Sequence, residues 1–176
     1  MSAAADVYPP FGLHVVAGPL ELRGLTDELL LDLCEVDDFC LDLAVLLDGR
    51  VIGAQGVSAS SFPVTRTGET GSWLGREFQG RGLGTAMRRA FCELLFDHLG
   101  FEEITSGAFV DNPASLAVSR KVGYEPTVVR RLERRDGELV LNQGLRLTPE
   151  SLVRGDVPVE VTGAAAVRSF IGLAEA

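Results

Sequence analysis

The chain has 176 residues, which suits one domain with a buried core, and its 46% hydrophobic and 23% charged residues are typical of a globular protein. The formal net charge of −9 argues against nucleic-acid binding, which needs a basic face, and it mildly favours a cationic partner, although solubility alone would explain it equally well. No apolar run reaches the roughly 18 residues that a membrane span requires, so a membrane protein is not expected.

The first half of the chain alternates apolar segments with turn residues. In chain order the sequence predicts a strand over 13–25, a helix capped by Thr26, a hairpin over 40–60 that turns at Asp48-Gly49, a loop over 61–67 and a strand over 68–78.

The second half opens with the clearest helix of the chain. Its apolar residues recur at spacings of three and four: Leu83, Met87, Ala90, Phe91, Leu94 and Leu95. After Gly100 the sequence predicts a strand over 101–110, a helix between Asn112 and Gly123, a hairpin over 126–147 that turns at Asp136-Gly137, and a tail over 149–176 with weak signals.

This order of elements predicts an α/β fold in a single domain over residues 1–176, with 149–176 as a tail of uncertain order. Strands that first run together and then alternate with helices indicate a mixed sheet. We expect a mostly antiparallel, twisted sheet of about six to seven strands with helices on both faces.

The cysteines indicate a reducing compartment. Cys34, Cys40 and Cys92 are odd in number and lack CxxC spacing, and His14 and His98 are isolated, so neither disulfides nor a metal site is expected. The N-terminus has no secretory pattern, and a cytoplasmic protein is predicted.

Three glycines, Gly80, Gly82 and Gly84, stand where the long helix should begin. A helix N-terminus presents unpaired N–H groups, and glycine lets an anion approach the backbone, so residues 79–85 are a candidate phosphate site. A tight turn with positive φ and close packing of the helix on the sheet is the alternative. The segment is neither a P-loop, because no lysine follows, nor a dinucleotide fingerprint, because Thr85 or Met87 stands at its last position.

The pattern Gln-x-x-Gly-x-Gly, from Gln79 to Gly84, resembles the motif with which GNAT acetyltransferases hold the pyrophosphate of acetyl-CoA. A second segment, "DNPASLAVSRKVGY", resembles the RimJ/RimL-like branch of that family at Asn112, Ser115, Val118, Lys121, Gly123 and Tyr124. The two motifs stand in the family's order, with a helix and a strand between them.

The resemblance implies that acetyl-CoA binds at Trp73, Leu74, Gln79, Gly80, Arg81, Gly82, Leu83, Gly84, Thr85, Asn112, Ser115 and Lys121. Basic residues crowd this region despite the acidic total: Arg76, Arg81, Arg88, Arg89, Arg120 and Lys121. At least one of Arg88 and Arg89 is expected on the solvated face of the long helix.

The resemblance also implies how an acetyl group would move to a primary amine of a peptide N-terminus or a small molecule. The backbone N–H of Leu74 would face the thioester carbonyl, and Glu69 would act as base, unless it is simply an exposed carboxylate. Ser119 stands where many relatives carry a tyrosine that protonates the departing thiolate. Alternatively, Ser119 only packs near the cofactor. Tyr124 is expected in the core, and Trp73 lines the acceptor tunnel or belongs to the core.

The short segment 34–40 departs from the family, which usually places a further helix there beside the acceptor. The acceptor side is then open, completed by a second subunit of a homodimer, or covered by the tail. An enzyme that uses another acyl-CoA, and a CoA-binding sensor or interaction module without turnover, remain alternatives.

Overall fold

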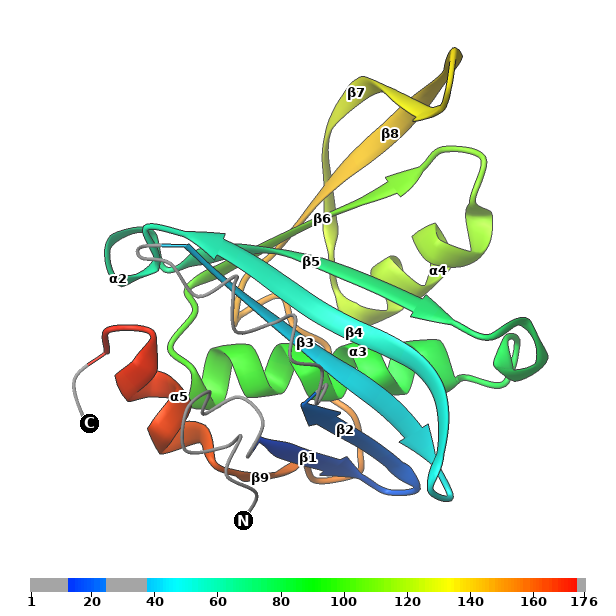
Figure 1. The fold of residues 1–176 in the computed structure, drawn as a ribbon. Coiled ribbons are helices and arrows are strands. Elements are labelled where there is room, and N and C mark those ends of the chain that lie inside the picture. The colour runs from blue at the N-terminus through cyan, green and yellow to red at the C-terminus, as the bar shows by residue number, and fades with distance from the viewer. Residues whose placement is uncertain (1–12, 25–37, 174–176) are drawn as a thin grey trace.

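The computed structural model describes residues 13–24 and 38–173, which form one open sheet with helices packed against it (Figure 1). The strand order is β7-β8-β6-β5-β4-β3-β2-β1-β9, and every neighbouring pair is antiparallel except β5 and β6. The mixed, mostly antiparallel α/β class is therefore confirmed, with nine strands in place of six to seven. The expected helix after Thr26 and residues 34–37 of the short segment lie outside the described residues.

The first strands are two hairpins. β1 (His14–Ala17) and β2 (Leu20–Gly24) pair across a turn at Gly18, whose φ is +62°, so the prediction of one strand over 13–25 is wrong. β3 (Asp38–Leu47) and β4 (Arg50–Ser60) form the predicted second hairpin. Asp48 and Gly49 both have positive φ there, as a turn that follows the twist of the strands requires.

A short helix, α2 (Phe62–Thr65), replaces the loop expected over 61–67. The Phe62 ring is fully buried and lies 4.3 Å, centroid to centroid, from the ring of Phe101. This anchor fixes the chain before it enters β5 (Thr67–Leu74), which a 3-10 turn, η3 (Arg76–Phe78), follows.

The predicted long helix is α3 (Leu83–Glu93), which continues as a π-helical turn, η4 (Leu94–His98), and ends before Gly100. β6 (Glu103–Phe109) then leads to α4 (Pro113–Val122). Both predicted caps of α4 are confirmed: the Asn112 side chain accepts from the N–H of Ser115, and Gly123 has a left-handed φ of +106°. Among the described residues, no helix combines the length and apolar character needed to cross a bilayer.

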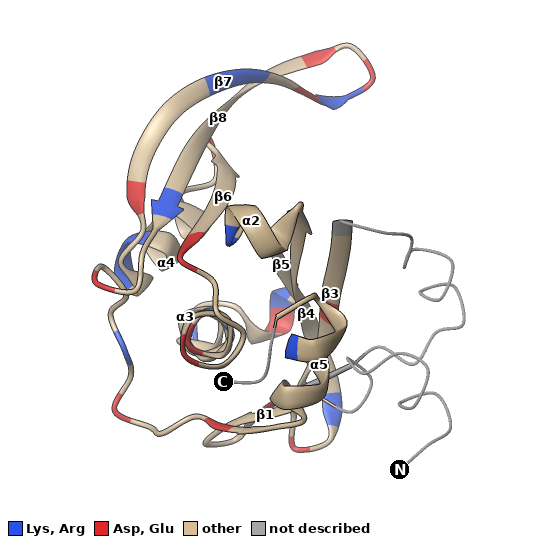
Figure 2. Ribbon diagram, turned by 90° about the vertical axis from the view of Figure 1, so that its left-hand side faces the viewer, with Lys and Arg blue, Asp and Glu red and all other residues tan. Residues whose placement is uncertain are grey.

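The last third of the chain adds strands at both edges of the sheet. β7 (Glu125–Arg135) and β8 (Glu138–Leu147) form the predicted hairpin, which projects from the body of the molecule (Figures 1 and 2). β9 (Glu160–Thr162) pairs with β1, and α5 (Ala164–Phe170) follows. Neither β9 nor α5 is predicted from the sequence, and β9 together with the split of the first strand accounts for the higher strand count.

Candidate active site

The central feature of the site is the divergence of β5 and β6. These parallel strands pair over only four positions, from Thr67 opposite Glu103 to Thr70 opposite Ser106. The Ser106 hydroxyl donates to the carbonyl of Thr70 at 2.9 Å, and beyond this point the second half of β5 has no partner on that side. The sheet therefore opens between two of its middle strands.

The opening frees backbone groups of β5. The N–H of Gly75 donates to the carbonyl of Ile52 in β4, so alternation along the antiparallel pair directs the N–H groups of Ser72 and Leu74 away from β4, to the side from which β6 has diverged. The carbonyl of Leu74 accepts from Nε2 of Gln79 at 2.9 Å, which ties the glycine-rich turn to the end of the strand.

The glycine-rich turn is open to the outside. Gly80 and Gly82 have φ values of +73° and +82°, and a Cβ atom at either position would meet no atom within 4 Å. Gly82 is the N-cap of α3, and no side chain caps this end. Gly84 differs, because its Cβ position lies 3.7 Å from Val118 and 3.8 Å from Leu74, where α3 approaches α4 and β5. The tight turn and the close packing of the helix, which are the alternative explanation for the glycines, are therefore both present. The open space in front of Gly80 and Gly82 also leaves room for an anion.

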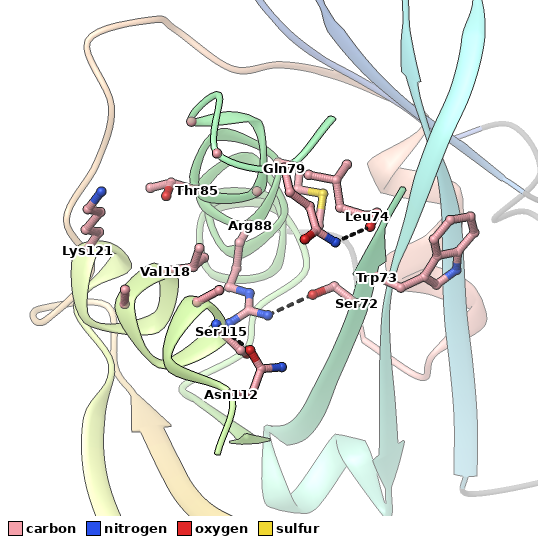
Figure 3. Close-up of a pocket in the computed structure, with 16 residues that line it drawn as sticks. Ser72, Trp73, Leu74, Gln79, Thr85, Arg88, Asn112, Ser115, Val118 and Lys121 are labelled. Carbon is pink, nitrogen blue, oxygen red and sulfur yellow. Dashed lines mark hydrogen bonds between the residues drawn. The ribbon is translucent and has the colours of Figure 1, made fainter. Parts of the chain in front are cut away.

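A cavity of about 520 Å³ lies between β5, the glycine-rich turn, α3 and α4 (Figure 3). Its walls combine backbone, small side chains and a few polar groups: Ser72, Trp73, Leu74, Gln79, Gly80, Gly82, Gly84, Thr85, Met87, Arg88, Asn112, Ala114, Ser115, Ala117, Val118 and Lys121. Concave sites of this size and composition are typical of small-molecule binding.

The structure brings ten of the twelve predicted binding residues to this cavity, all except Arg81 and Leu83. Arg81 is exposed and its guanidinium lies over the Phe78 ring, while Leu83 packs against the core. Sequence reasoning missed Ala114, Ala117 and Val118 in α4. Their spacing of three and four residues, which continues to Lys121, places them on one helix face and could have identified them.

Arg88 does not lie on the solvated face of α3, where the sequence predicts at least one of Arg88 and Arg89. Its side chain is only 8% exposed and spans the cavity wall, donating to Oγ of Ser119 at 2.8 Å and to Oγ of Ser72 at 2.7 Å. Its Nε has no hydrogen-bond partner among the described residues. Arg89 is half-buried and donates to the carbonyl of Lys121, so neither arginine is freely solvated.

Ser119 and Tyr124 lie behind this wall. Ser119 is fully buried, and its hydroxyl donates to the carbonyl of Ser115, so Arg88 is the group that reaches the cavity at this place. Tyr124 belongs to the core, as expected, with its hydroxyl 3.0 Å from Oγ1 of Thr70. Burial raises the pKa of Tyr124 well above its usual value, which keeps the phenol neutral.

Glu69 and Trp73 lie on the other face of β5. Side chains alternate along a strand, and because Thr70 and Ser72 point towards α3 and α4, those of Glu69 and Trp73 point away. Both are exposed, Trp73 by 60%, and Figure 3 shows the indole turned away from the two helices. Trp73 still borders the cavity from this face, whereas Glu69 does not line it and lies opposite Thr105, where β5 and β6 are still paired.

The comparison with protein families decides the identity of this fold. The profile described as "Acetyltransferase (GNAT) domain" matches residues 21–125, which is more than half of the chain and includes the diverging strands, the glycine-rich turn and α4. The chain belongs to the GNAT acetyltransferase family.

Individual relatives of this GNAT domain agree with the RimJ/RimL-like branch. The putative ribosomal N-acetyltransferase YdaF of Bacillus subtilis is 31% identical over 85 residues, which are 48% of this chain and 45% of YdaF, so the chain matches less than half the length of this curated relative. Mycobacterium smegmatis RimJ in complex with CoA-disulfide has a TM-score of 0.66 at 17% identity, over 89% of this chain and 93% of RimJ.

A third relative is RimL, the ribosomal L7/L12 alpha-N-protein acetyltransferase, solved in complex with coenzyme A. It has a TM-score of 0.64 at 16% identity, over 77% of this chain and 97% of RimL. At identities this low, the likeness to RimJ and RimL shows the shared fold alone.

Proposed function

We propose that this chain binds acetyl-CoA in the cavity between β5 and α4 and transfers the acetyl group to a primary amine, of a peptide N-terminus or of a small molecule. The observation that carries the proposal is the opening of the sheet. It leaves the backbone N–H of Leu74 without a strand partner among the described residues, in a cavity that begins at a helix N-terminus with no side-chain cap.

The end of the cavity at the N-terminus of α3 fits a pyrophosphate. Gly80 and Gly82 leave open space where side chains would stand, and the first N–H groups of α3 have no side-chain partner. Thr85 and Lys121 line the same end and supply a hydroxyl and a positive charge (Figure 3). This local charge offsets the repulsion that a chain of net charge −9 exerts on a polyanion.

Bound acetyl-CoA would supply an acyl thioester, and the residues of the chain supply the electrostatics. The N–H of Leu74 would donate to the thioester oxygen as negative charge develops on it, and removal of one such donor typically costs about 2.7–4 kcal/mol. The acceptor amine must be neutral to attack. An α-amino group with a pKa of about 7.7–8.0 needs less help than a lysine side chain with a pKa of about 10.4.

Glu69 would take the proton of the amine, directly or through water. Its place on the face opposite α3 implies that the acceptor approaches from that face, while acetyl-CoA occupies the other. Gly71 separates Glu69 from Trp73, and a Cβ atom there would meet nothing within 4 Å, so the path beside β5 is open among the described residues.

The proposal is tested with the whole chain, acetyl-CoA and a panel of amines that includes peptides with free N-termini. We expect binding of CoA by calorimetry and amine-dependent release of free thiol. Binding without thiol release above hydrolysis would refute turnover and favour the sensor alternative, whereas a higher rate with longer thioesters would point to a different acyl donor.

A further inference from the structure

Arg88 is a buried cation for which the described residues offer no anion. Its guanidinium is bound by two neutral hydroxyls, and no ion pair joins it to a carboxylate in residues 13–24 and 38–173. Burying an unpaired charge is costly, and the structure adds an unpartnered Nε to that cost. Since Arg88 also lines the cavity, the missing anion is expected to be part of a ligand.

The groups around Arg88 cannot supply the negative charge. Ser72 in β5 and Ser119 in α4 are neutral hydroxyls. The Tyr124 ring lies 6.0 Å from the guanidinium carbon, and Cys92 lies beside its hydroxyl. Burial raises the pKa of both Tyr124 and Cys92, that of Cys92 to about 12, so both stay protonated. Lys121, the other cation that lines the cavity, has the same sign.

The phosphates of CoA are not the natural partner of this cation. Arg88 comes six residues after Gly82, about 9 Å further along the axis of α3. Its hydrogen bonds to Ser72 and Ser119 also hold the guanidinium across the middle of the cavity, below the end lined by Thr85 and Lys121 (Figure 3). An extended ligand whose phosphates lie at Gly82 would bring its far end to Arg88.

We propose that Arg88 stabilises the thiolate of CoA as it leaves, in place of a proton donor. This inference rests on the proposed function. In the step concerned, the amine nitrogen forms a bond to the acyl carbon, and the carbon–sulfur bond breaks with its electron pair on sulfur. The proton of the amine goes to Glu69 or to water. The sulfur needs no proton within the site, because the charge of Arg88 balances its own.

This assignment explains two features of the site. Among the described residues, Tyr124 faces the core and the Ser119 hydroxyl donates to a backbone carbonyl, so neither is placed to give a proton to a thiol in the cavity, and the charge of Arg88 would take the place of that proton. The assignment also gives the two serines a role: they position the guanidinium and leave its remaining N–H groups for the ligand.

The test measures the pKa of the CoA thiol when CoA is bound, by the ultraviolet absorbance of the thiolate during a pH titration. The complex with desulfo-CoA, which lacks the sulfur, subtracts the protein's own thiols and phenols. We expect the wild-type protein to lower the thiol pKa by about 1 to 3 pH units relative to free CoA, as an opposite charge at close range does.

Variants assign the shift to Arg88. R88Q should abolish the shift while CoA affinity changes by less than about tenfold, and R88K should keep part of it. K121Q is the matched control: it should weaken CoA binding at the phosphate end and leave the thiol pKa as low as in the wild type. Circular dichroism confirms that each variant is folded, and the wild-type comparison with free CoA needs no variant at all.

Three outcomes would overturn the proposal. One is a bound thiol with the pKa of free CoA. Another is a shift of the thiol pKa that is equal in wild type and R88Q. The third is a preference for a dicarboxylic acyl-CoA, such as succinyl-CoA, that R88Q removes, because Arg88 would then bind an acyl carboxylate. If CoA fails to bind at all, the proposed function fails instead, so the two failures are distinguishable.

Discussion

A pair of substitutions at Gly82, to Asn and to Asp, tests the phosphate site directly. Gly82 has a φ of +82°, and a side chain there would meet no protein atom within 4 Å. Asn and Asp are similar in size, and both are tolerated in the left-handed region better than other residues, at a cost of about 1–2 kcal/mol. We therefore expect both variants to fold, with melting temperatures lowered together by about 2–8 °C.

The two variants differ in charge, which makes their difference in CoA affinity informative. A unit negative charge about 4 Å from a phosphate charge costs between about 1 kcal/mol in water and about 4 kcal/mol near a protein surface. Converted at about 1.4 kcal/mol per factor of ten, Gly82→Asp should bind CoA roughly 5-fold to 10³-fold more weakly than Gly82→Asn. Isothermal titration calorimetry at low ionic strength measures both constants.

Added salt is the internal control, because screening should narrow the gap between the two variants. Equal affinities for Asn and Asp at low salt, with both variants folded, would show that no phosphate lies at Gly82. The glycine would then serve the turn alone, and the assignment of the cavity to CoA would lose its anchor.

Three further predictions concern the base, the core and pH. Glu69→Gln should lower kcat more than it lowers CoA affinity, and turnover equal to that of the wild type would remove Glu69 as the base. Tyr124→Phe should cost about 0.5–1.5 kcal/mol of unfolding free energy through the lost hydrogen bond to Thr70, with CoA affinity unchanged because Tyr124 does not line the cavity; a large loss of affinity would contradict that placement. Burial raises the pKa of Cys92 from 9.0 to about 12, so the folded state holds this proton more tightly than the unfolded state. The free energy of unfolding should therefore fall as the pH rises from about 9 towards 12. Urea unfolding at about pH 8 and about pH 10.5 should show a smaller decline for Cys92→Ala than for the wild type, and equal declines would rule out Cys92 as a source.

The features predicted correctly are those that a few neighbouring residues determine. Asp48-Gly49 and Asp136-Gly137 specify hairpin turns, and the positive φ that such turns need is found at Asp48, Gly49 and Gly137. Asn112 caps α4 through a hydrogen bond that spans three residues, and Gly123 ends the same helix. The Gly18-Pro19 pair carries the same kind of local information, and its turn could have been predicted.

Other features depend on parts of the chain that are distant in sequence. β9 has three residues and exists as a strand because β1 offers it a partner. Arg88 looks like part of a charged helix face, and its burial follows only when β5 and α4 close over it with Ser72 and Ser119. The glycine-rich turn can be recognised in the sequence because its glycines lie close together in the chain. The position of Arg88 cannot, because β5 and α4, between which it lies, come together only in the folded chain.

The opening between β5 and β6 also divides the molecule mechanically. β6, β7 and β8 form one part of the sheet and β1 to β5 with β9 form the other, and only the four residue pairs between β5 and β6 join the two parts along the sheet. A long ligand bound between β5 and β6 would contact both parts and hold them together. We therefore expect amide hydrogen exchange in the C-terminal half of β5 to slow when this ligand is bound, while exchange in the distant β3–β4 hairpin stays unchanged.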